Sequence, residues 1–264
     1  MPKKANKTIW ICRDCAGEHF SWSGKCSYCS HWNTLTEFKD QSASLGSSAK
    51  IVQPVVLSKI SSDARARLRT KIDEFDLAMG GGIVKGSVLL IGGNPGIGKS
   101  TLIWQVAKNL NDTVCYVAAE ESSSQIKIRA ERLGALSDKI LIFEDRNIDN
   151  VLISLANIKP SLIIVDSIQT IYDSSVSGTA GNILQIRSCT LKLIDYAKRN
   201  SVAVIIIGHV TKDGEVAGPK TLEHLVDGVF YLEGSSSGEE RFLRASKNRF
   251  GSIDEIGIFE MSEK

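Results

Sequence analysis

A phosphate-binding loop is indicated by the stretch Gly93-Asn94-Pro95-Gly96-Ile97-Gly98-Lys99-Ser100, which fits the pattern G-x-x-x-x-G-K-[ST]. Its glycines let backbone N–H groups turn inward around phosphate oxygens, and a helix that follows directs its N-terminus at the same anion. Lys99 supplies a mobile positive charge for the β- and γ-phosphates, and the Ser100 hydroxyl is suited to ligate Mg²⁺. The dinucleotide pattern G-x-G-x-x-G is not met, because Thr101 stands in place of the third glycine. We therefore expect ATP and Mg²⁺ to bind at residues 93–101, and the competing interpretation is a structural glycine-rich turn.

Short apolar runs and helical patterns alternate on both sides of this loop. An apolar run at 88–92 leads into it, and a helical pattern at 99–110 follows it. Such alternation is typical of an α/β fold with a mostly parallel sheet and helices on both faces, as in RecA-like ATPases. After residue 224 the pattern changes to consecutive strands joined by turns, which indicates an antiparallel C-terminal extension. The further strands are predicted at 114–118, 140–143, 161–165, 202–207, 229–232, 241–246 and 255–260, and the further helices at 123–133, 149–158 and 183–199.

Acidic residues follow two of the predicted strands. Asp166 ends the apolar stretch Leu162-Ile163-Ile164-Val165, and the carboxyl end of a strand in a parallel sheet faces the ligand crevice. Asp166 is therefore expected to hold Mg²⁺ directly or through water, unless it only caps the next turn. Glu120 and Glu121 follow the strand at 114–118, where RecA-type ATPases place a catalytic glutamate. Glu120 is the predicted group that orients or deprotonates water, because it follows the strand most closely; the alternative is a pair of solvated acids at a helix start.

Four of the six cysteines form two close pairs, Cys12-x2-Cys15 and Cys26-x2-Cys29. Two such knuckles are typical of a tetrahedral Zn²⁺ site. A unit of fewer than about forty residues has too little apolar core to fold unaided, so the metal would supply folding energy. The alternative is a reduced, metal-free thiol cluster.

The composition is ordinary for a soluble globular protein, with 264 residues of which 42% are hydrophobic and 23% charged. A formal net charge of +2 neither argues for nucleic-acid binding nor excludes a local basic patch. We expect a cytoplasmic protein without a membrane span, because no apolar run is long enough and no apolar signal core follows the basic N-terminus. The expected units are a four-cysteine zinc module at 1–38, a flexible Ser- and Gly-containing linker at 39–58 and a RecA-like ATPase domain at 59–264.

The chain resembles the RadA/Sms family of bacterial recombination proteins through ordered blocks that cover nearly its whole length. The zinc module carries the first block, Trp22-Ser23-Gly24-Lys25-Cys26-Ser27-Tyr28-Cys29. The last block is Lys247-Asn248-Arg249-Phe250-Gly251, which matches the family's signature K-N-R-F-G motif. A phosphate-binding loop alone would not identify a family, but the combination does. The blocks between these two lie at 80–87, 120–122, 166–170, 208–212 and 217–224.

The resemblance implies a DNA-dependent ATPase that acts in DNA repair, assembles as a hexameric ring and binds single-stranded and branched DNA. Together with RecA, such proteins drive branch migration of recombination intermediates and act as helicases. ATP lies between subunits in these rings, so Lys247 and Arg249 would reach a neighbour's nucleotide as an arginine finger does. His209 would sense the γ-phosphate. Lys212 and Lys220 are candidate DNA phosphate contacts, because the loops at 174–182 and 211–221 match DNA-facing loops of RecA-type proteins; ordinary solvation is the alternative.

Several features depart from the family pattern. Lys71 stands where the family tends to have glycine, and Ala16 and Ser30 follow the cysteine knuckles, where glycine is common. The family continues into a Lon-protease-like domain, whereas this chain stops at Lys264, so we expect a C-terminally truncated form. That difference leaves the stability of a hexamer open.

Two other functions stay open at this point. One is a regulatory RecA-type ATPase that binds protein partners instead of DNA, although the zinc module and the K-N-R-F-G block speak against it. The other is a binding module without turnover, in which nucleotide only stabilises the assembly.

Overall fold

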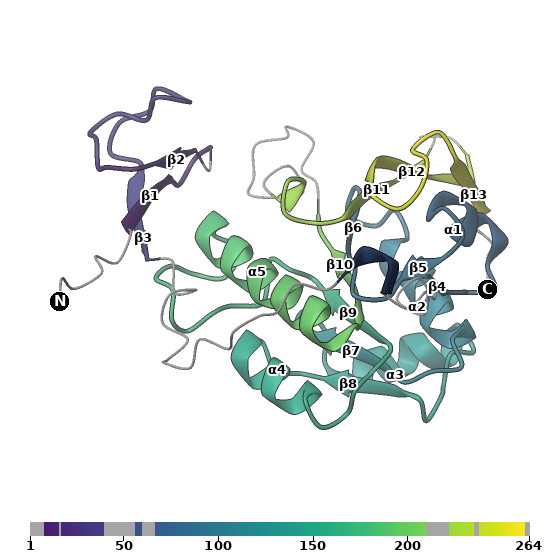
Figure 1. Cartoon of the computed structure of the whole chain (residues 1–264). Helices are drawn as coiled ribbons and strands as arrows, with labels where there is room; N and C mark the ends of the chain where they lie inside the picture. Colours follow the sequence, from purple (N-terminus) through teal and green to yellow (C-terminus); the bar gives the residue numbers. More distant parts are fainter. Residues whose placement is uncertain are drawn as a thin grey trace.

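The computed structural model describes residues 8–15, 17–39, 56–59, 67–209, 222–234 and 238–261. The strands of its main sheet are β6 (Val88–Gly92), β7 (Val114–Ala118), β8 (Ile140–Phe143), β9 (Leu162–Asp166), β10 (Ala203–Ile207), β11 (Gly228–Gly234), β12 (Glu240–Asn248) and β13 (Ile256–Glu260). Within the described residues they form one eight-stranded sheet in the order β13-β12-β11-β6-β10-β9-β7-β8 (Figure 1).

Most of this sheet is parallel. The strands from β8 across to β11 pair in parallel, and β12 and β13 pair antiparallel beyond β11. The strands β6, β7, β9 and β10 are buried along their whole length and are rich in Val, Ile and Leu, as expected for strands covered on both faces. The predicted RecA-like architecture, with an antiparallel extension at the C-terminal end, is confirmed.

Helices cover both faces of the sheet. The helices are α1 (Asp73–Ala78), α2 (Lys99–Asn109), α3 (Ser123–Arg132), α4 (Ile148–Leu155) and α5 (Ile183–Asn200). The first three pack into one apolar cluster, which includes Trp104, and the last two pack into another, which includes Leu193. Ile163 and Ile164 belong to different clusters, because successive residues of a strand point to opposite faces.

Left-handed backbone positions account for two local features. The fourth helix ends at Leu155, short of the predicted residue 158. Lys159 is left-handed, with φ of 51°, and the residue before a proline disfavours the α-helical conformation, so Pro160 limits the helix. Lys71, at the position where the resemblance leads one to expect glycine, also has a positive φ of 59°. A side chain costs about 1 kcal/mol in this conformation, which explains why glycine suits the position.

A separate three-stranded sheet is formed by β1 (Thr8–Cys12), β2 (Glu18–His19) and β3 (Leu35–Lys39), in the order β2-β1-β3. It lies beside α5 in Figure 1, and an ion pair joins Glu18 Oε1 to Arg187 Nη2 over 2.5 Å. Most of the predicted linker at 39–58 lies outside the described residues, and the 3₁₀-helix η2 (Leu57–Lys59) occupies its end. The domain boundaries at residues 38 and 58 stay predictions.

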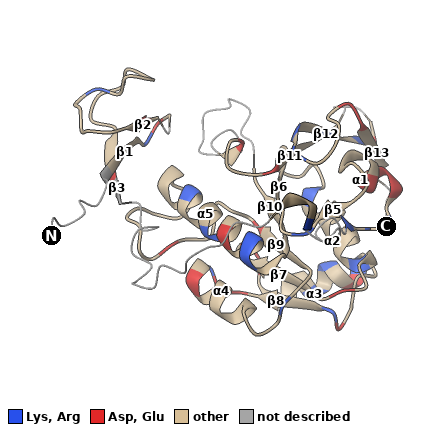
Figure 2. Cartoon of the chain, viewed as in Figure 1, with Lys and Arg blue, Asp and Glu red and all other residues tan. Residues whose placement is uncertain are grey.

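Two smaller features complete the arrangement. A short ribbon joins β4 (Arg67–Leu68), before α1, to β5 (Ile83–Val84), after it. Lys and Arg are interspersed with Asp and Glu over the helices and the C-terminal strands (Figure 2). No helix in the described ranges is both long and apolar enough to cross a bilayer.

Candidate functional site

The phosphate-binding loop lies between the carboxyl end of β6 and the first turn of α2, as its pattern predicts. Gly93 has to be glycine, because its φ is 150° and a Cβ there would lie 2.6 Å from the carbonyl oxygen of Leu232. Gly98 precedes α2 with φ of 109°, which side chains rarely tolerate. Arg241 on β12 donates from Nε to the Ile97 carbonyl over 3.2 Å. The C-terminal strands therefore help to hold the loop in place.

Lys99 is buried at the base of the loop, with 4% of its surface exposed. Its Nζ donates hydrogen bonds to the carbonyl oxygens of Gly93 at 2.8 Å and Asn94 at 3.0 Å. Burial lowers the pKa of Lys99, while the nearby carboxylates of Asp166 and Glu120 oppose that shift. These two acids favour the ammonium form, which is the form that attracts phosphate oxygens.

Asp166 ends β9 at the edge of the sheet where the loop lies, and it is buried. The Tyr116 hydroxyl donates a short hydrogen bond to Asp166 Oδ2. Tyr116 in turn packs against Trp104, with ring centroids 4.8 Å apart. Ser100 and Asp166 line the same cavity, and hydroxyl and carboxylate oxygens are ligands that Mg²⁺ prefers. The donor set therefore fits a magnesium ion.

The two neighbouring glutamates after β7 have different surroundings. Glu120 Oε1 accepts a hydrogen bond from the Ser167 hydroxyl and lies 3.4 Å from His209 Nε2. The hydrogen bond with His209, followed by that from Ser167, lowers the pKa of Glu120 against the opposing effect of burial. Glu121 is instead paired with Arg129, with 2.5 Å between Oε1 and Nη2. Glu120 thus stays ionised beside the cavity, while Glu121 is held by an arginine.

One cavity of about 260 Å³ brings these groups together at the carboxyl edge of the parallel strands. The predicted site residues that line it are Gly96, Gly98, Lys99, Ser100, Thr101, Glu120, Asp166 and His209. The predicted loop residues that shape the loop without lining the cavity are Gly93, Asn94, Pro95 and Ile97. Residues from four separate segments of the chain therefore converge on one space.

Substitution of His209 by alanine is expected to raise the pKa of Glu120, because the hydrogen bond that favours its carboxylate form is lost. A glutamate protonated at higher pH cannot accept a proton from water, so the acid limb of the pH–rate profile should move upward. The measurement is kcat for ATP hydrolysis from about pH 4 to 8. His224, an exposed histidine that does not line the cavity, supplies the control variant His224→Ala. An acid limb that stays in place would contradict the role of His209.

The K-N-R-F-G block lies at the amino ends of the parallel strands, whereas the cavity lies at their carboxyl ends. The backbone N–H of Arg249 donates to the Asp227 carbonyl at 3.0 Å, and that of Asp227 donates to the Val88 carbonyl at 2.9 Å. Val88 begins β6 and Gly92 ends it, so the block and the phosphate-binding loop are separated by the length of that strand, ~13 Å. Neither Lys247 nor Arg249 lines the cavity of its own chain.

The loops expected to face DNA are described only in part. Lys212 and Lys220 lie outside the described residues. The loop at 174–182 is described, and Gln185 of α5 anchors it by donating from Nε2 to the carbonyl oxygens of Val176 at 2.6 Å and Gly178 at 3.2 Å. This loop is therefore held against the first turn of α5.

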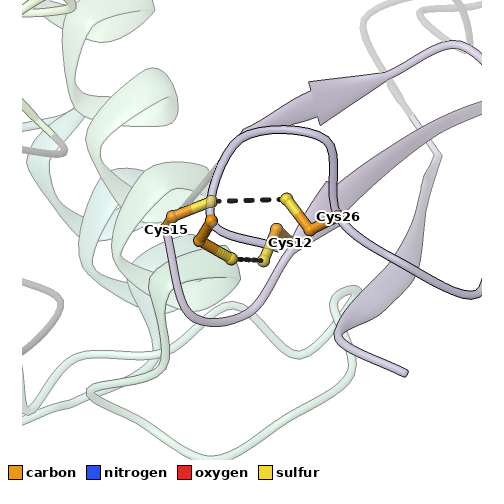
Figure 3. Close-up of side chains that lie close together, drawn as sticks. Cys12, Cys15 and Cys26 are labelled. Carbon is orange, nitrogen blue, oxygen red and sulfur yellow. Dashed lines mark hydrogen bonds between the residues drawn. The ribbon is translucent and has the colours of Figure 1, made fainter. Parts of the chain in front are cut away.

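The four paired cysteines gather in the small sheet, where the sulfur atoms of Cys12, Cys15 and Cys26 point into one space (Figure 3). All four Sγ atoms lie within 4.8 Å of one another, and the pairs Cys12–Cys29 and Cys15–Cys26 are each 3.6 Å apart. A tetrahedron of sulfurs at ~2.3 Å from Zn²⁺ has edges of ~3.8 Å, whereas a disulfide bond measures ~2 Å. The cluster therefore fits a zinc ion.

The surroundings of the cluster agree with this fit. The Thr34 hydroxyl lies 3.2 Å from Cys12 Sγ, where it can donate to a thiolate. Ser30, which follows the second knuckle, has a left-handed φ of 64°. The position thus has the conformation that favours glycine although it carries a side chain. Ala16, after the first knuckle, lies outside the described residues.

Three polar residues of the nucleotide cavity were not predicted from the sequence: Tyr116, Arg129 and Arg132. Tyr116 lies inside an apolar strand pattern, so its hydroxyl gave no local sign of a partner 50 positions away. The two arginines are spaced by three along α3, which places them on one face of the helix. The spacing of the two arginines, together with Glu120 and Glu121 just before α3, is the sequence feature that could have indicated that this helix face lines the cavity.

Several known proteins resemble this chain in sequence. The family model described as "ATPase: KaiC" matches residues 68–146. A protein named DNA repair protein RadA from Halalkalibacterium halodurans is 43% identical over 272 residues, which cover 100% of this chain and 59% of that protein. The protein of the same name from Listeria monocytogenes is 41% identical, and the match covers 100% of this chain and 59% of that protein. The one from Bacillus subtilis is 42% identical, and the match covers 98% of this chain and 58% of that protein. The chain thus spans about three-fifths of the length of these relatives.

Solved structures support the fold. The flagellar accessory protein FlaH from Methanocaldococcus jannaschii superposes with a TM-score of 0.58 over 76% of this chain and 96% of FlaH. Its sequence is 17% identical to this chain. At that identity the likeness concerns the RecA-like fold alone.

Proposed function

We propose that this chain is the ATP-hydrolysing part of a DNA repair protein, and that DNA stimulates its ATP hydrolysis. The proposal rests on the similarity to bacterial RadA proteins along the whole length of this chain. The observation that carries the ATPase proposal is the convergence of Lys99, Ser100, Asp166 and Glu120 on one cavity. Phosphoryl transfer needs groups that position phosphates, metal and water, and these four residues supply them.

Each residue has a role in this proposal. Residues 93–101 bind the triphosphate, and Lys99 contacts its β- and γ-oxygens. Ser100 and Asp166 hold Mg²⁺, which neutralises charge on the phosphates. Glu120 orients or deprotonates the attacking water. His209 keeps Glu120 ionised and senses the γ-phosphate, since both side chains line the cavity.

Lys247 and Arg249 act on the nucleotide of a neighbouring subunit in this proposal. Support comes from their position at the amino ends of the parallel strands. The length of β6 separates this position from the cavity of their own chain. A head-to-tail ring would bring that edge to the cavity of the next subunit. The two cations would then stabilise charge on the transferring phosphoryl group, as an arginine finger does.

Alanine at Lys247 should leave nucleotide binding intact and lower kcat for ATP hydrolysis by ~10²-fold or more. Lys99→Ala should fail to bind nucleotide but keep its own Lys247. Mixing the two variants in equal amounts should restore about a quarter of the hydrolysis, because a complete site needs one intact half from each neighbour. Steady-state hydrolysis of the mixture is the measurement. A mixture as inactive as its components, or a Lys247→Ala variant with full activity, would remove the role in trans.

The DNA part of the proposal rests on the relatives. We propose that single-stranded and branched DNA bind at the loops 174–182 and 211–221, with Lys212 and Lys220 contacting phosphates. Branch migration, helicase activity, a hexameric ring and cooperation with RecA belong to the same proposal. The cluster of four cysteines holds Zn²⁺ and keeps the N-terminal module folded.

The test is ATP hydrolysis measured without DNA, with single-stranded DNA and with a four-way junction. Stimulation of several-fold or more by either DNA is expected, and Lys99→Ala should abolish the rate in all three conditions. Equal rates with and without DNA, together with an absence of DNA binding in a gel-shift assay, would contradict the proposal. The salt dependence of binding would report how many phosphate contacts are made.

A regulatory ATPase without DNA translocation is the second candidate. The match of residues 68–146 to the KaiC ATPase model favours it as much as it favours a DNA repair protein. The identity of more than 40% to RadA proteins along the whole chain favours DNA repair. The same assay separates the two, since a regulatory ATPase would hydrolyse ATP at a rate that DNA does not change.

A further inference from the structure

Asp227 is a buried carboxylate that joins three elements of the ATPase fold. It lies just before β11 and is 6% exposed. Its Oδ2 accepts a hydrogen bond from the backbone N–H of Val88 at 3.1 Å, and its Oδ1 accepts one from Arg249 Nη1 at 2.9 Å. Its backbone also bonds to both partners, through the Val88 carbonyl and the Arg249 N–H. Side chain and main chain thus both link the start of the strand that leads to the phosphate-binding loop with the K-N-R-F-G block.

The second cation of the block is anchored to the same turn. Lys247 Nζ donates to the carbonyl oxygen of Glu223 at 2.5 Å. The side chain of Glu223 is itself fixed, because it accepts a hydrogen bond from the Tyr231 hydroxyl at 2.9 Å. The described turn 222–227 therefore holds both cations on one short segment.

We propose that Asp227 is a positioning residue, which aims Arg249 at the nucleotide of the neighbouring subunit. This inference rests on the role in trans proposed for Arg249. With both oxygens engaged and its backbone tied to Val88, the carboxylate has a single orientation. The Arg249 side chain is half exposed, so one end of the guanidinium is held while the remainder faces outward. A fixed guanidinium loses less conformational entropy when it meets a phosphoryl group than a free one does.

Charge gives a second reason for the carboxylate. Lys247 and Arg249 are like charges on one strand end, and their repulsion opposes a shared position. Burial and the charge of Arg249 lower the pKa of Lys247, while the charges of Asp227 and Glu223 oppose that effect. Hydrogen bonding to Val88 could be satisfied by a neutral acceptor, but only an acid offsets the two cations. Because Val88 begins β6, the same residue connects a subunit's own phosphate-binding strand with the cation that it offers to its neighbour.

The test is a double-mutant cycle on DNA-stimulated ATP hydrolysis with Asp227→Asn, Arg249→Ala and the double variant. Asparagine keeps the size of the side chain but offers Arg249 no charge and only one oxygen. We expect Asp227→Asn to lower kcat ~10-fold with KM for ATP changed less than about twofold. In the Arg249→Ala background the same substitution should have no further effect, because Asp227 acts on the reaction only through the Arg249 side chain. Asp227→Ser, whose hydroxyl can still accept from Val88, should reproduce the loss if the asparagine variant folds poorly.

Asp195→Asn is the matched control, since it breaks an exposed aspartate–arginine pair with Arg199 on α5 and should leave hydrolysis unchanged. Additive losses in the cycle, or a rise in KM with unchanged kcat, would overturn the positioning role. The premise is tested separately, because an Arg249→Ala variant with full activity refutes the role of Arg249 itself. A loss in Arg249→Ala with full activity in Asp227→Asn refutes only the present inference.

Discussion

Glutamine in place of Glu120 should lower kcat for ATP hydrolysis by ~10²–10⁴-fold while nucleotide binding persists. The amide keeps the size of the carboxylate and can still accept from Ser167, but it cannot take a proton from water. Lys99 and the metal ligands are untouched, so the affinity for ATP should change little. Single-turnover hydrolysis and the binding of a fluorescent ATP analogue measure the two quantities separately.

Glu121→Gln is the internal control for this result. Glu121 is paired with Arg129, and its loss should cost far less than the loss of Glu120, because it does not share the contacts with His209 and Ser167. The reverse ranking would transfer the catalytic role to Glu121. Hydrolysis at the wild-type rate in both variants would show that neither acid takes part in the reaction.

Removal of zinc should unfold residues 8–39 and leave the nucleotide site intact. Within the described residues, the buried apolar side chains of the module are only Ile11, Cys12, Cys26 and Leu35, which is too little to offset the entropy of ordering it. Structural Zn²⁺ in small modules contributes ~10–16 kcal/mol of apparent binding energy at neutral pH. We expect one zinc ion per chain, its release by a thiol-modifying reagent, and faster proteolysis of the N-terminal segment afterwards.

The cysteine variants make this prediction specific. Cys15→Ser should lose zinc and the resistance of the module to protease. Cys189→Ala is the matched control, since Cys189 lies on the buried face of α5 away from the cluster, and this variant should keep the full zinc content. A Cys15→Ser protein that retains stoichiometric zinc and a folded module would show that the four sulfurs do not bind the ion together.

Local sequence pattern was sufficient wherever a feature depends on neighbours in the chain. The strands at 88–92, 114–118 and 140–143 have the bounds that the sequence predicts, because each is a continuous apolar run; β6 and β7 are buried along their whole length, whereas the edge strand β8 is half-buried. Helix ends were less accurate, as the early end of α4 before Lys159 and Pro160 shows. The spacing of glycines, lysine and serine in the loop at 93–100 predicted its place between β6 and α2 for the same local reason.

The phosphate-binding loop, the RecA-like alternation of strands and helices, and the paired cysteines can all be predicted from the sequence alone, because each is encoded by spacing over a few residues. Which side chains contact one another across the fold becomes visible only in the folded chain. Tyr116 bonds Asp166 across 50 positions, and Arg249 bonds Asp227 across 22. The antiparallel direction of β12 also places Lys247 and Arg249 at the amino ends of the parallel strands, away from their own cavity. Such pairings depend on how strands are ordered and which ends coincide, and local periodicity carries no information about either.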